Sequence, residues 1–572
     1  MVCLITGEPF MARLQGGYLV SKALYDLGVR DVFTLGGGHI NPVYRACTDL
    51  GIRLVDTHHE QGAAMAADAY GRLRRVPGIC LVTAGPGLTN ALTGVSGSYL
   101  ANSPMMLISG RSGIEENDRM SLQEIDQEAI VRPVTKWART VYEVGRLEEY
   151  VSAAYGAAIS ARPGPVYLGM SYEVLYPSCD EREASPARAP VPDTDCEPPE
   201  RKISEFFRLL SASKRPVVVV GSGGWYSGAE QSILEFAERL GAPFFTLNMG
   251  RGILPDNHKC CFGAASPASP GGFREISANT DLVILLGIRL SIYAGFGNTI
   301  NPNAKTVQVD INPEEIGRNR PADLGVVCDL DSFLAKANLY ARENKASLNF
   351  SSWMKEARSA RSRARAAFRR TVSKSKGIHP AAVAKTVSDY LGGEGVIAVD
   401  GGDCQSWTDL SSEVRKPGHY LKGGPLGCMG VGVPFALGAK VAFPEKPVAL
   451  VTGDGAVAMN FMEMETAVRH SIPFVAVVCN DSAWGMTKHQ IEITYPDAGA
   501  TQGVDLGFVD FHEIIKAMGG YGEKIENIKD LTPALERAFS SGLPAVLNVR
   551  TDPDAVSGAT RVITEMMMRA MD

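Results

Sequence analysis

Short, uninterrupted runs of apolar residues recur along the chain and alternate with longer, helix-like segments. Within these runs Val, Ile and Leu follow one another directly instead of alternating with polar residues, which is typical of strands buried on both faces. Such strands belong to parallel sheets covered by helices, so the pattern predicts doubly wound α/β layers. Examples of such runs occupy residues 78–85, 104–110, 215–224, 281–287, 306–311, 395–402, 447–455 and 473–481.

The length of the chain and two breaks in its composition indicate the domain organisation. A chain of 572 residues predicts about three domains. Residues 179–201 are rich in proline and charge, which favours a linker. Residues 351–377 are strongly basic, and we interpret them as a solvated helix face leading into a connector rather than a nucleotide or acyl-carrier patch. We therefore predict three doubly wound parallel-sheet α/β domains, at residues 1–188, 189–350 and 351–572.

Charge and hydropathy exclude several classes of protein. The net charge of −6 argues against nucleic-acid binding, because nucleic-acid-binding proteins are usually basic. No apolar run approaches the roughly 18 residues of a membrane span, and the first residues lack the basic flank and apolar run of a signal peptide. The 11 cysteines are scattered without a CxxC pair, which fits a reducing compartment. We expect a cytoplasmic protein.

The clearest chemical signal is a carboxylate between two glycines at the end of a predicted strand. The stretch 448–455 contains Gly-Asp-Gly, with Asp454 in the middle. A helix is predicted at residues 462–470 and a second strand at 473–479, which ends at Asn-Asp with Asp481. In this βαβ arrangement both strand ends emerge at the carboxyl edge of a parallel sheet, where open α/β sheets bind ligands. Asp454 and Asp481 are therefore expected to converge.

The residue types at this edge suit a metal-bridged diphosphate. Two carboxylates are hard oxygen ligands of the kind that Mg²⁺ combines with phosphate oxygens. Gly453 and Gly455 let the backbone turn sharply and approach a ligand without a Cβ in the way. The peptide N–H groups near Gly455 and Ala456, at the start of a helix, suit a phosphate.

Gly-Asp-Gly followed after about 25 residues by Asn-Asn is the thiamine-diphosphate (ThDP) signature, and this chain resembles the decarboxylase/carboligase superfamily. That superfamily includes acetolactate synthase, benzaldehyde lyase, oxalyl-CoA decarboxylase and 2-hydroxyacyl-CoA lyase. The resemblance implies that Asp454, Asp481 and the backbone carbonyl of Ala483 bind Mg²⁺. Because this chain has Asn-Asp where the family has Asn-Asn, the extra carboxylate favours a harder cation such as Ca²⁺ but makes the charge balance beside a diphosphate less favourable.

The segment 55–72, VDTHHEQGAAMAADAYGR, resembles the pyrimidine-binding segment of the family. The resemblance implies that Glu60 is the catalytic glutamate. A carboxyl group hydrogen-bonded to pyrimidine N1′ favours the imino tautomer, whose 4′ nitrogen removes the weakly acidic C2 proton. The segment 83–110 also resembles the family, and it makes Asn90 the expected polar contact to the cofactor.

Two segments of the third predicted domain complete the expected cofactor site. Residues 425–442 resemble the segment with the bulky residue under the thiazolium, which is Met429 by position and bends the cofactor into a V shape. Residues 400–407 fall where the family contacts the diphosphate. The expected contacts there are Gly402, Asp403 and Cys404.

Two residues of the first predicted domain indicate the reaction. His39 and Gln123 lie at the positions of the family's substrate loops, and as neutral groups they are able to move a proton to or from a hydroxyl or ketone oxygen. This combination most resembles benzaldehyde lyase. Acetolactate synthase usually has Phe where Gln123 stands, and oxalyl-CoA decarboxylase an apolar residue where His39 stands.

The substrate pocket is expected to follow the metal loop. Its predicted lining residues are Trp484, Gly485, Met486 and Gln490. Met486 stands where benzaldehyde lyase has a small residue, so a bulky aromatic acceptor is not expected to fit. We expect small aliphatic aldehydes, 2-hydroxy ketones or 2-hydroxyacyl thioesters such as acyl-CoA compounds.

The resemblance also implies the role of the central domain and the assembly. In relatives the central domain binds FAD, binds ADP or stays empty, and Asp310 would contact an adenosine ribose. Because residues 262–272 lack the usual flavin-contacting pattern, we expect a structural domain, with FAD or ADP as alternatives. The active site of the family lies between two subunits, so the minimal active unit is a homodimer, and a homotetramer is usual.

Three functions remain open from the sequence. The first is a lyase/carboligase that reversibly cleaves a 2-hydroxy ketone or 2-hydroxyacyl-CoA into an aldehyde and a second fragment. The second is a 2-keto acid decarboxylase or synthase like acetolactate synthase, and the third is a catalytically silent relative that binds ThDP. The presence of Glu60 argues against the third.

Overall fold

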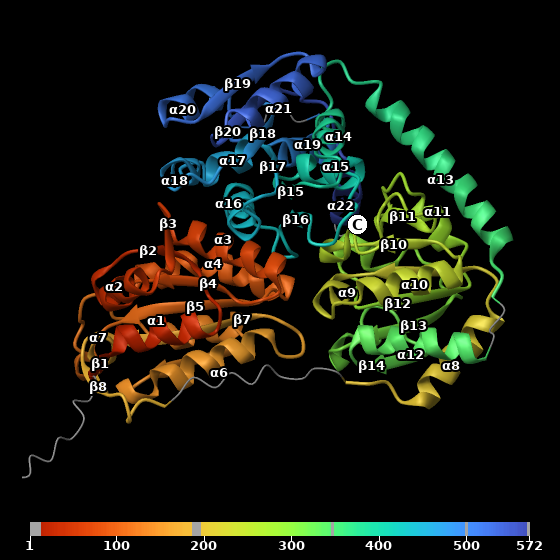
Figure 1. Cartoon of the computed structure of the whole chain (residues 1–572). Coiled ribbons are helices and arrows are strands. Elements are labelled where there is room, and N and C mark those ends of the chain that lie inside the picture. Colours follow the sequence, from red (N-terminus) through yellow and green to blue (C-terminus); the bar gives the residue numbers. More distant parts are fainter. Residues whose placement is uncertain (1–12, 186–195, 345–347, 498–501, 569–572) are drawn as a thin grey trace, which may run out of the picture. The chain divides into compact units, whose positions relative to one another are not determined.

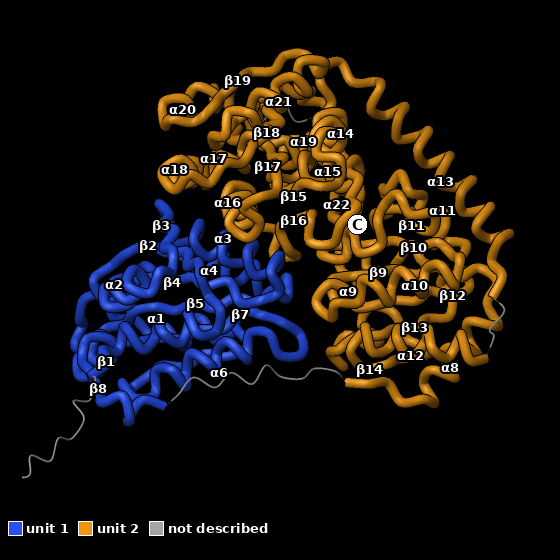
Figure 2. The backbone as a smooth tube through the Cα atoms, viewed as in Figure 1, with its two compact units in different colours: residues 1–192 blue, residues 193–572 orange. Residues whose placement is uncertain are grey.

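We describe a computed structural model of the chain, which covers residues 13–185, 196–344, 348–497 and 502–568 (Figure 1). The chain forms two compact units, residues 1–192 and 193–572 (Figure 2). The first unit contains one six-stranded parallel sheet and the second contains two. The predicted α/β class with three parallel sheets is therefore confirmed. The start of the chain and part of the predicted linker lie outside the described residues, and the predicted cuts at 188 and 350 stay predictions.

The sheet of the first unit has the order β3-β2-β4-β5-β7-β6, and a short antiparallel pair, β1-β8, lies outside it. The central strands β4 and β5 are buried along almost their whole length, as their continuous apolar sequences predict. The strands are β1 Arg13–Gln15, β2 Asp31–Leu35, β3 Arg53–Asp56, β4 Gly78–Val82, β5 Met105–Arg111, β6 Trp137–Val141, β7 Pro165–Ser171 and β8 Ser178–Asp180. The helices are α1 Gly16–Asp26, α2 Asn41–Leu50, α3 Glu60–Arg74, α4 Pro86–Ala101, α5 Gln127–Val131, α6 Leu147–Ile159 and α7 Tyr172–Leu175.

The second unit begins with a sheet of the order β11-β10-β9-β12-β13-β14. In chain order this is 3-2-1-4-5-6, the order of dinucleotide-binding doubly wound folds. Its strands are β9 Pro216–Val220, β10 Phe244–Thr246, β11 Cys261–Ala264, β12 Leu282–Leu286, β13 Lys305–Asp310 and β14 Leu324–Val327. The accompanying helices are α8 Glu200–Ala212, α9 Ser222–Tyr226, α10 Glu230–Leu240, α11 Phe273–Ala278, α12 Leu330–Glu343 and α13 Ser351–Val372.

The remaining sheet of the second unit has the order β16-β15-β17-β18-β20-β19. Numbered by their sequence within each sheet, its strands follow the order 2-1-3-4-6-5, the same as in the first unit. The strands are β15 Val396–Val399, β16 Tyr420–Lys422, β17 Val448–Gly453, β18 Val475–Asn480, β19 Tyr521–Ile525 and β20 Ala545–Arg550. The helices are α14 Pro380–Leu391, α15 Asp403–Ser411, α16 Gly432–Ala442, α17 Asp454–Met459, α18 Glu463–Arg469, α19 Gly485–Thr494, α20 Phe511–Ala517, α21 Leu531–Ser540 and α22 Gly558–Met568.

All eight apolar runs contain a strand, but the turn after β17 differs from the prediction. The strand continues through Gly453, and α17 begins at once with Asp454, well before the predicted helix at 462–470. The helical stretch is interrupted at Asn460, whose φ and ψ are −131° and 35°, and continues as α18. Asp454 is therefore the first residue of a helix, where the peptide N–H groups of the first turn have no acceptor within the helix.

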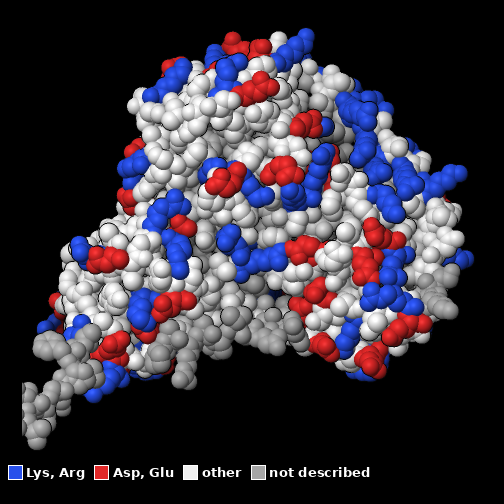
Figure 3. Space-filling model, in the orientation of Figure 1, with Lys and Arg blue, Asp and Glu red and all other residues white. Residues whose placement is uncertain are grey.

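The basic segment is helical, as predicted. Arginine and lysine side chains gather over α13 in Figure 3. Its first half has a buried face that joins the core of the central sheet through Trp353, Met354, Ala357 and Ala360. Arg363 pairs with Glu275, so part of the charge is compensated locally. Among the helices of the described residues, none combines the length and apolarity needed to cross a membrane.

Candidate functional site

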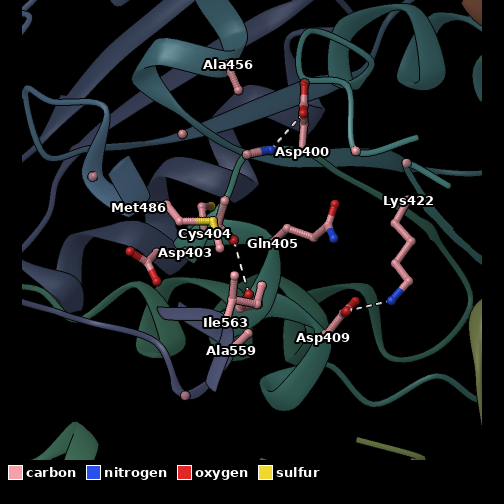
Figure 4. A pocket seen from close by; sticks show the side chains of 18 of the residues that line it. Asp400, Asp403, Cys404, Gln405, Asp409, Lys422, Ala456, Met486, Ala559 and Ile563 are labelled. Carbon is pink, nitrogen blue, oxygen red and sulfur yellow. Dashed lines mark hydrogen bonds and ion pairs between the residues drawn. The ribbon is translucent and has the colours of Figure 1, made fainter. Parts of the chain in front are cut away.

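A cavity of about 530 Å³ opens at the carboxyl edge of the third sheet, within the second unit (Figure 4). It is lined by every residue that the sequence places in the cofactor and substrate site of this unit. These residues are Gly402, Asp403, Cys404, Met429, Gly453, Asp454, Gly455, Ala456, Asp481, Ala483, Trp484, Gly485, Met486 and Gln490. The turns after β15, β17 and β18 contribute most of this set, because these three strands are neighbours in the sheet.

The two carboxylates predicted to bind a cation lie against each other. Asp454 follows β17 and Asp481 follows β18, and the two strands pair directly. Burial, together with the negative charge of Asp481, raises the pKa of Asp454 to about 8, and burial also raises the pKa of Asp481. A divalent cation between them would remove this repulsion, so the residues present fit a Mg²⁺ or Ca²⁺ site.

The loop after β18 is fixed by hydrogen bonds to its own side chains. Oδ1 of Asn480 accepts from the N–H of Ser482 at 3.2 Å, and Oδ1 of Asp481 accepts from the N–H of Ala483 at 3.2 Å. Ser482 has a φ of 64°, a left-handed conformation that this bonding maintains. Within the ranges that the structure covers, no three His, Cys, Asp or Glu side chains are grouped to hold a metal ion. A cation here would therefore rely on two carboxylates, a carbonyl and the ligand.

Three glycines of the site are required by close approaches. A Cβ on Gly455 would lie 2.6 Å from the ring of Trp484, and one on Gly402 would lie 2.6 Å from Cβ of Met486. A Cβ on Gly485 would lie 2.4 Å from Oδ2 of Asp481. Contacts this short are forbidden, so glycine is needed for the two turns and the start of α19 to pack around the cavity.

The side chain of Asp403, which was predicted to contact the diphosphate, is bonded to other groups of the protein. One carboxylate oxygen lies 2.7 Å from Nδ1 of His489, and the other accepts hydrogen bonds from Ser557 N–H at 2.9 Å and from the Thr560 hydroxyl at 2.6 Å. In Figure 4 the carboxylate points away from Gln405. Only the backbone of Asp403, at the start of α15, is left to face an anion.

Met429 lies on a glycine-rich loop that a buried carboxylate holds. Gly427 and Gly430 flank it with φ values of 71° and 82°. Asp400, at the end of β15, accepts from Gly401 N–H at 2.7 Å and from Gly432 N–H at 2.8 Å. Burial raises the pKa of Asp400 to about 6. Asp400 was not among the predicted site residues, although this aspartate directly precedes Gly401 and Gly402 in the 395–402 run.

In the first unit, the glutamate predicted to be catalytic is hydrogen-bonded to an asparagine of the neighbouring helix. Glu60 is the first residue of α3 and is 6% exposed. Its Oε2 accepts a hydrogen bond from Nδ2 of Asn90, on α4, at 2.9 Å. Asn90 was expected to contact the cofactor, and the structure shows it orienting this carboxylate.

The two predicted proton donors of the first unit converge on one threonine. Oγ1 of Thr83 lies 3.4 Å from Nδ1 of His39 and 3.4 Å from Oε1 of Gln123. Burial lowers the pKa of His39, which keeps its ring neutral near pH 7. Gln123 has a φ of 64° on a loop that Gln127 ties down, since Gln127 accepts from Gly85 N–H at 2.8 Å. Thr83 was missed because a threonine after a strand carries no distinctive sequence signal.

Parts of the cavity wall come from regions that the sequence analysis left out. Helix α22 lines it with apolar side chains, and loops of the central sheet contribute Asn248, Tyr293 and Phe296. Lys422 also lines the cavity and pairs with Asp409 at 2.7 Å, as Figure 4 shows. The predicted ribose contact, Asp310, accepts from the N–H of Asn312 at 2.9 Å and does not line this cavity.

Comparison with protein-family models gives three matches that follow the three sheets. Residues 14–130 match the N-terminal TPP binding domain of thiamine pyrophosphate enzymes, residues 203–337 the central domain, and residues 400–549 the C-terminal TPP binding domain. Thiamine pyrophosphate is another name for ThDP, so the matches support ThDP as the cofactor. The chain belongs to the thiamine pyrophosphate enzyme family.

Similar proteins of known name indicate which group of the family this chain belongs to. The chain is 32% identical over 544 residues to the acetolactate synthase large subunit of Mycobacterium tuberculosis, covering 94% of this chain and 96% of that protein. It is 31% identical over 590 residues to human 2-hydroxyacyl-CoA lyase 2, covering 94% and 90%. It is 31% identical over 567 residues to 2-hydroxyacyl-CoA lyase of Arabidopsis thaliana, covering 96% and 97%. The chain is thus a ThDP-dependent enzyme of the acetolactate synthase and 2-hydroxyacyl-CoA lyase group.

Proposed function

We propose that the protein is a ThDP- and divalent-cation-dependent carbon–carbon lyase and carboligase. Its proposed substrates are 2-hydroxy ketones or 2-hydroxyacyl thioesters, which it cleaves to, or forms from, small aldehydes. The observation that carries the proposal is the convergence of His39 and Gln123 on Thr83, in the unit that also contains Glu60. Cleaving a bond beside a carbinol requires a proton to leave its hydroxyl group. A neutral His side chain can accept that proton, and a Gln side chain can hydrogen-bond the oxygen that loses it.

The residues that would hold the cofactor are those of the two TPP-binding regions. Asp454, Asp481 and the carbonyl of Ala483 would bind the cation, and the N–H groups of Gly455 and Ala456 would face the diphosphate. ThDP, when bound, supplies a carbon nucleophile for the carbonyl carbon of the substrate.

The first unit would control the protons. Glu60 would exchange a proton with N1′ of the pyrimidine, and Asn90 fixes the direction in which its carboxylate points. His39 would accept the proton of the substrate hydroxyl, because its lowered pKa leaves a ring nitrogen available. Gln123 would donate a hydrogen bond to the same oxygen and hold it in place.

The variant Glu60→Gln tests the proton relay. It keeps the size and the hydrogen-bonding capacity of the side chain but removes its acid–base function. We expect ThDP to bind with near-normal affinity while kcat falls at least ~100-fold. Retention of most of the activity would show that Glu60 has another role.

We further propose that the active site forms between two subunits, with a homodimer as the minimal unit and a homotetramer as the usual assembly. Complementation tests this directly, because Glu60→Gln and Asp454→Asn would damage opposite halves of each site. A heterodimer of the two inactive variants would contain one intact site and regain about half of the wild-type activity. A heterodimer without activity would place both halves of a site in one chain.

A substrate panel separates this function from the alternative, a 2-keto acid decarboxylase or synthase. The 32% identity to a mycobacterial acetolactate synthase subunit favours testing pyruvate first. Release of CO₂ from pyruvate supports the alternative, whereas release of aldehyde from an acyloin or a 2-hydroxyacyl-CoA supports the lyase. Binding of ThDP without turnover of any compound would indicate a catalytically silent protein.

A further inference from the structure

The last helix of the described chain, α22, forms one wall of the cavity. Its side chains at Ala559, Val562, Ile563 and Met566 line the cavity, and Figure 4 shows Ala559 and Ile563 at its edge. The helix also has a second, polar face. Thr560 and Thr564 are buried there, at 0% and 1% exposure. A helix that packs through two hydroxyl groups needs specific partners for them.

The Thr564 hydroxyl donates to the carbonyl of Thr560 in the same helix at 2.7 Å, whereas the Thr560 hydroxyl leads to a buried ion pair. Asp403, on α15, accepts from the Thr560 hydroxyl at 2.6 Å and from Ser557 N–H, just before α22, at 2.9 Å. Its other oxygen lies 2.7 Å from Nδ1 of His489, on α19. Nε2 of His489 donates to the carbonyl of Pro553 at 2.7 Å, in the segment that leads to α22. The side chains of Asp403 and His489 thus join α15 and α19 to each other and to the segment from Pro553 to Ser557, which leads into α22.

The pair is stable in its charged form. Burial alone would raise the pKa of Asp403, but hydrogen bonds from His489, Ser557 and Thr560 outweigh it and leave the pKa lowered. Burial alone would lower the pKa of His489, but Asp403, the Pro553 carbonyl and the charge of Asp481 leave it raised. Asp403 and His489 are 7% and 2% exposed, so solvent screens their attraction little.

We propose that Asp403 and His489 are positioning residues that hold α22 as a wall of the cavity and tie it to the cofactor-binding turns. Each member of the pair lies on a helix that follows one of these turns. Helix α15, with Asp403, begins at the predicted diphosphate contact, and α19, with His489, begins four residues after Asp481. His489 also compensates the negative charge of Asp403, which would otherwise lie at the start of α15, close to a bound diphosphate. The link to α22 rests on the hydrogen bonds alone, and the link to the cofactor rests on the proposed function.

The variant Thr560→Val tests the attachment of α22, because it removes one hydroxyl and leaves the ion pair in place. We expect amide exchange of residues 558–568 in the full-length, cofactor-free protein to accelerate at least about tenfold. Thr560→Ser keeps the hydroxyl and should restore slow exchange. Thr386→Val is the matched control, since the Thr386 hydroxyl donates to a carbonyl of its own helix, at 2.9 Å. Unchanged exchange of α22 in Thr560→Val would overturn the proposal.

The variant His489→Gln tests the link to the cofactor. It leaves the charge of Asp403 uncompensated, so we expect faster exchange of α22 and at least about tenfold weaker binding of ThDP with Mg²⁺. His258→Gln, a histidine of the central region, should change neither. With an active substrate, Thr560→Val should raise KM more than it lowers kcat. Normal ThDP affinity in His489→Gln would refute the cofactor link, and failure of the wild type to bind ThDP would refute the proposed function instead.

Discussion

Replacing Asp481 by asparagine should stabilise the protein in the absence of metal. The pKa of Asp454 rises from 3.8 to about 8, about four units, and burial is its largest cause, with the charge of Asp481 second. Ionising Asp454 in the metal-free site therefore costs free energy, on the order of several kcal/mol. Because burial takes the larger share, we assign about 2 kcal/mol to the repulsion that Asp481→Asn removes. The asparagine oxygen still accepts from Ala483 N–H.

The effect has a defined pH dependence. A carboxyl group whose pKa is higher in the folded than in the unfolded protein destabilises the folded state as the pH rises above the unfolded value. For Asp454 this loss begins near pH 4 and is complete above about pH 8. The advantage of Asp481→Asn should therefore be small at pH 5 and largest at pH 8.5.

Thermal unfolding in EDTA measures this advantage. About 2 kcal/mol corresponds to a rise of about 5 °C in the Tm of the transition that unfolds the third sheet. Asp497→Asn, at an exposed position of the following loop, is the control and should leave Tm unchanged. With ThDP and Mg²⁺ the wild type should have the higher Tm, because the variant offers the cation one negative charge less. A lower Tm for Asp481→Asn in EDTA at pH 8.5, or an equal gain at pH 5, would refute the reasoning.

Three further substitutions test other parts of the site. Gly402→Ala places a Cβ 2.6 Å from Cβ of Met486, so ThDP affinity should fall about tenfold in a binding titration and recover when Met486→Gly, which removes that Cβ, is added. Thr83→Val removes the hydroxyl between His39 and Gln123, and kcat should fall while ThDP binding stays normal. Gln127→Leu removes hydrogen bonds to a backbone N–H, a carbonyl and two hydroxyl groups, and thermal unfolding should show a loss of about 2–4 kcal/mol.

Central strands such as β4 and β17 could be predicted because burial on both faces gives an uninterrupted apolar run in the sequence. An edge strand such as β16 could not, since it has three residues and ends in a lysine that pairs with Asp409. The convergence of Asp454 and Asp481 was also predictable. Both follow strands of one βαβ unit, and the geometry of a parallel sheet brings such strand ends together.

Contacts between distant side chains were not predictable in this way. Asp403 was predicted to be a cofactor contact because residues 400–407 fall where the family contacts the diphosphate, but the partners of its side chain are 86, 154 and 157 positions away. The bond between Glu60 and Asn90 spans 30 positions and joins two helices. No local pattern indicates which polar groups will satisfy one another across a fold, so the family resemblance assigned each of these residues to the cofactor alone.

The first and third sheets share one order of strands, and this gives each element of one a counterpart in the other. β4 corresponds to β17, so the turn through Gly85 into α4 corresponds to the turn through Gly453 into α17. The first turn is neutral and leads to Asn90, whereas the second carries a carboxylate. The same order of strands therefore supports two kinds of turn at corresponding positions, a neutral one and an acidic one.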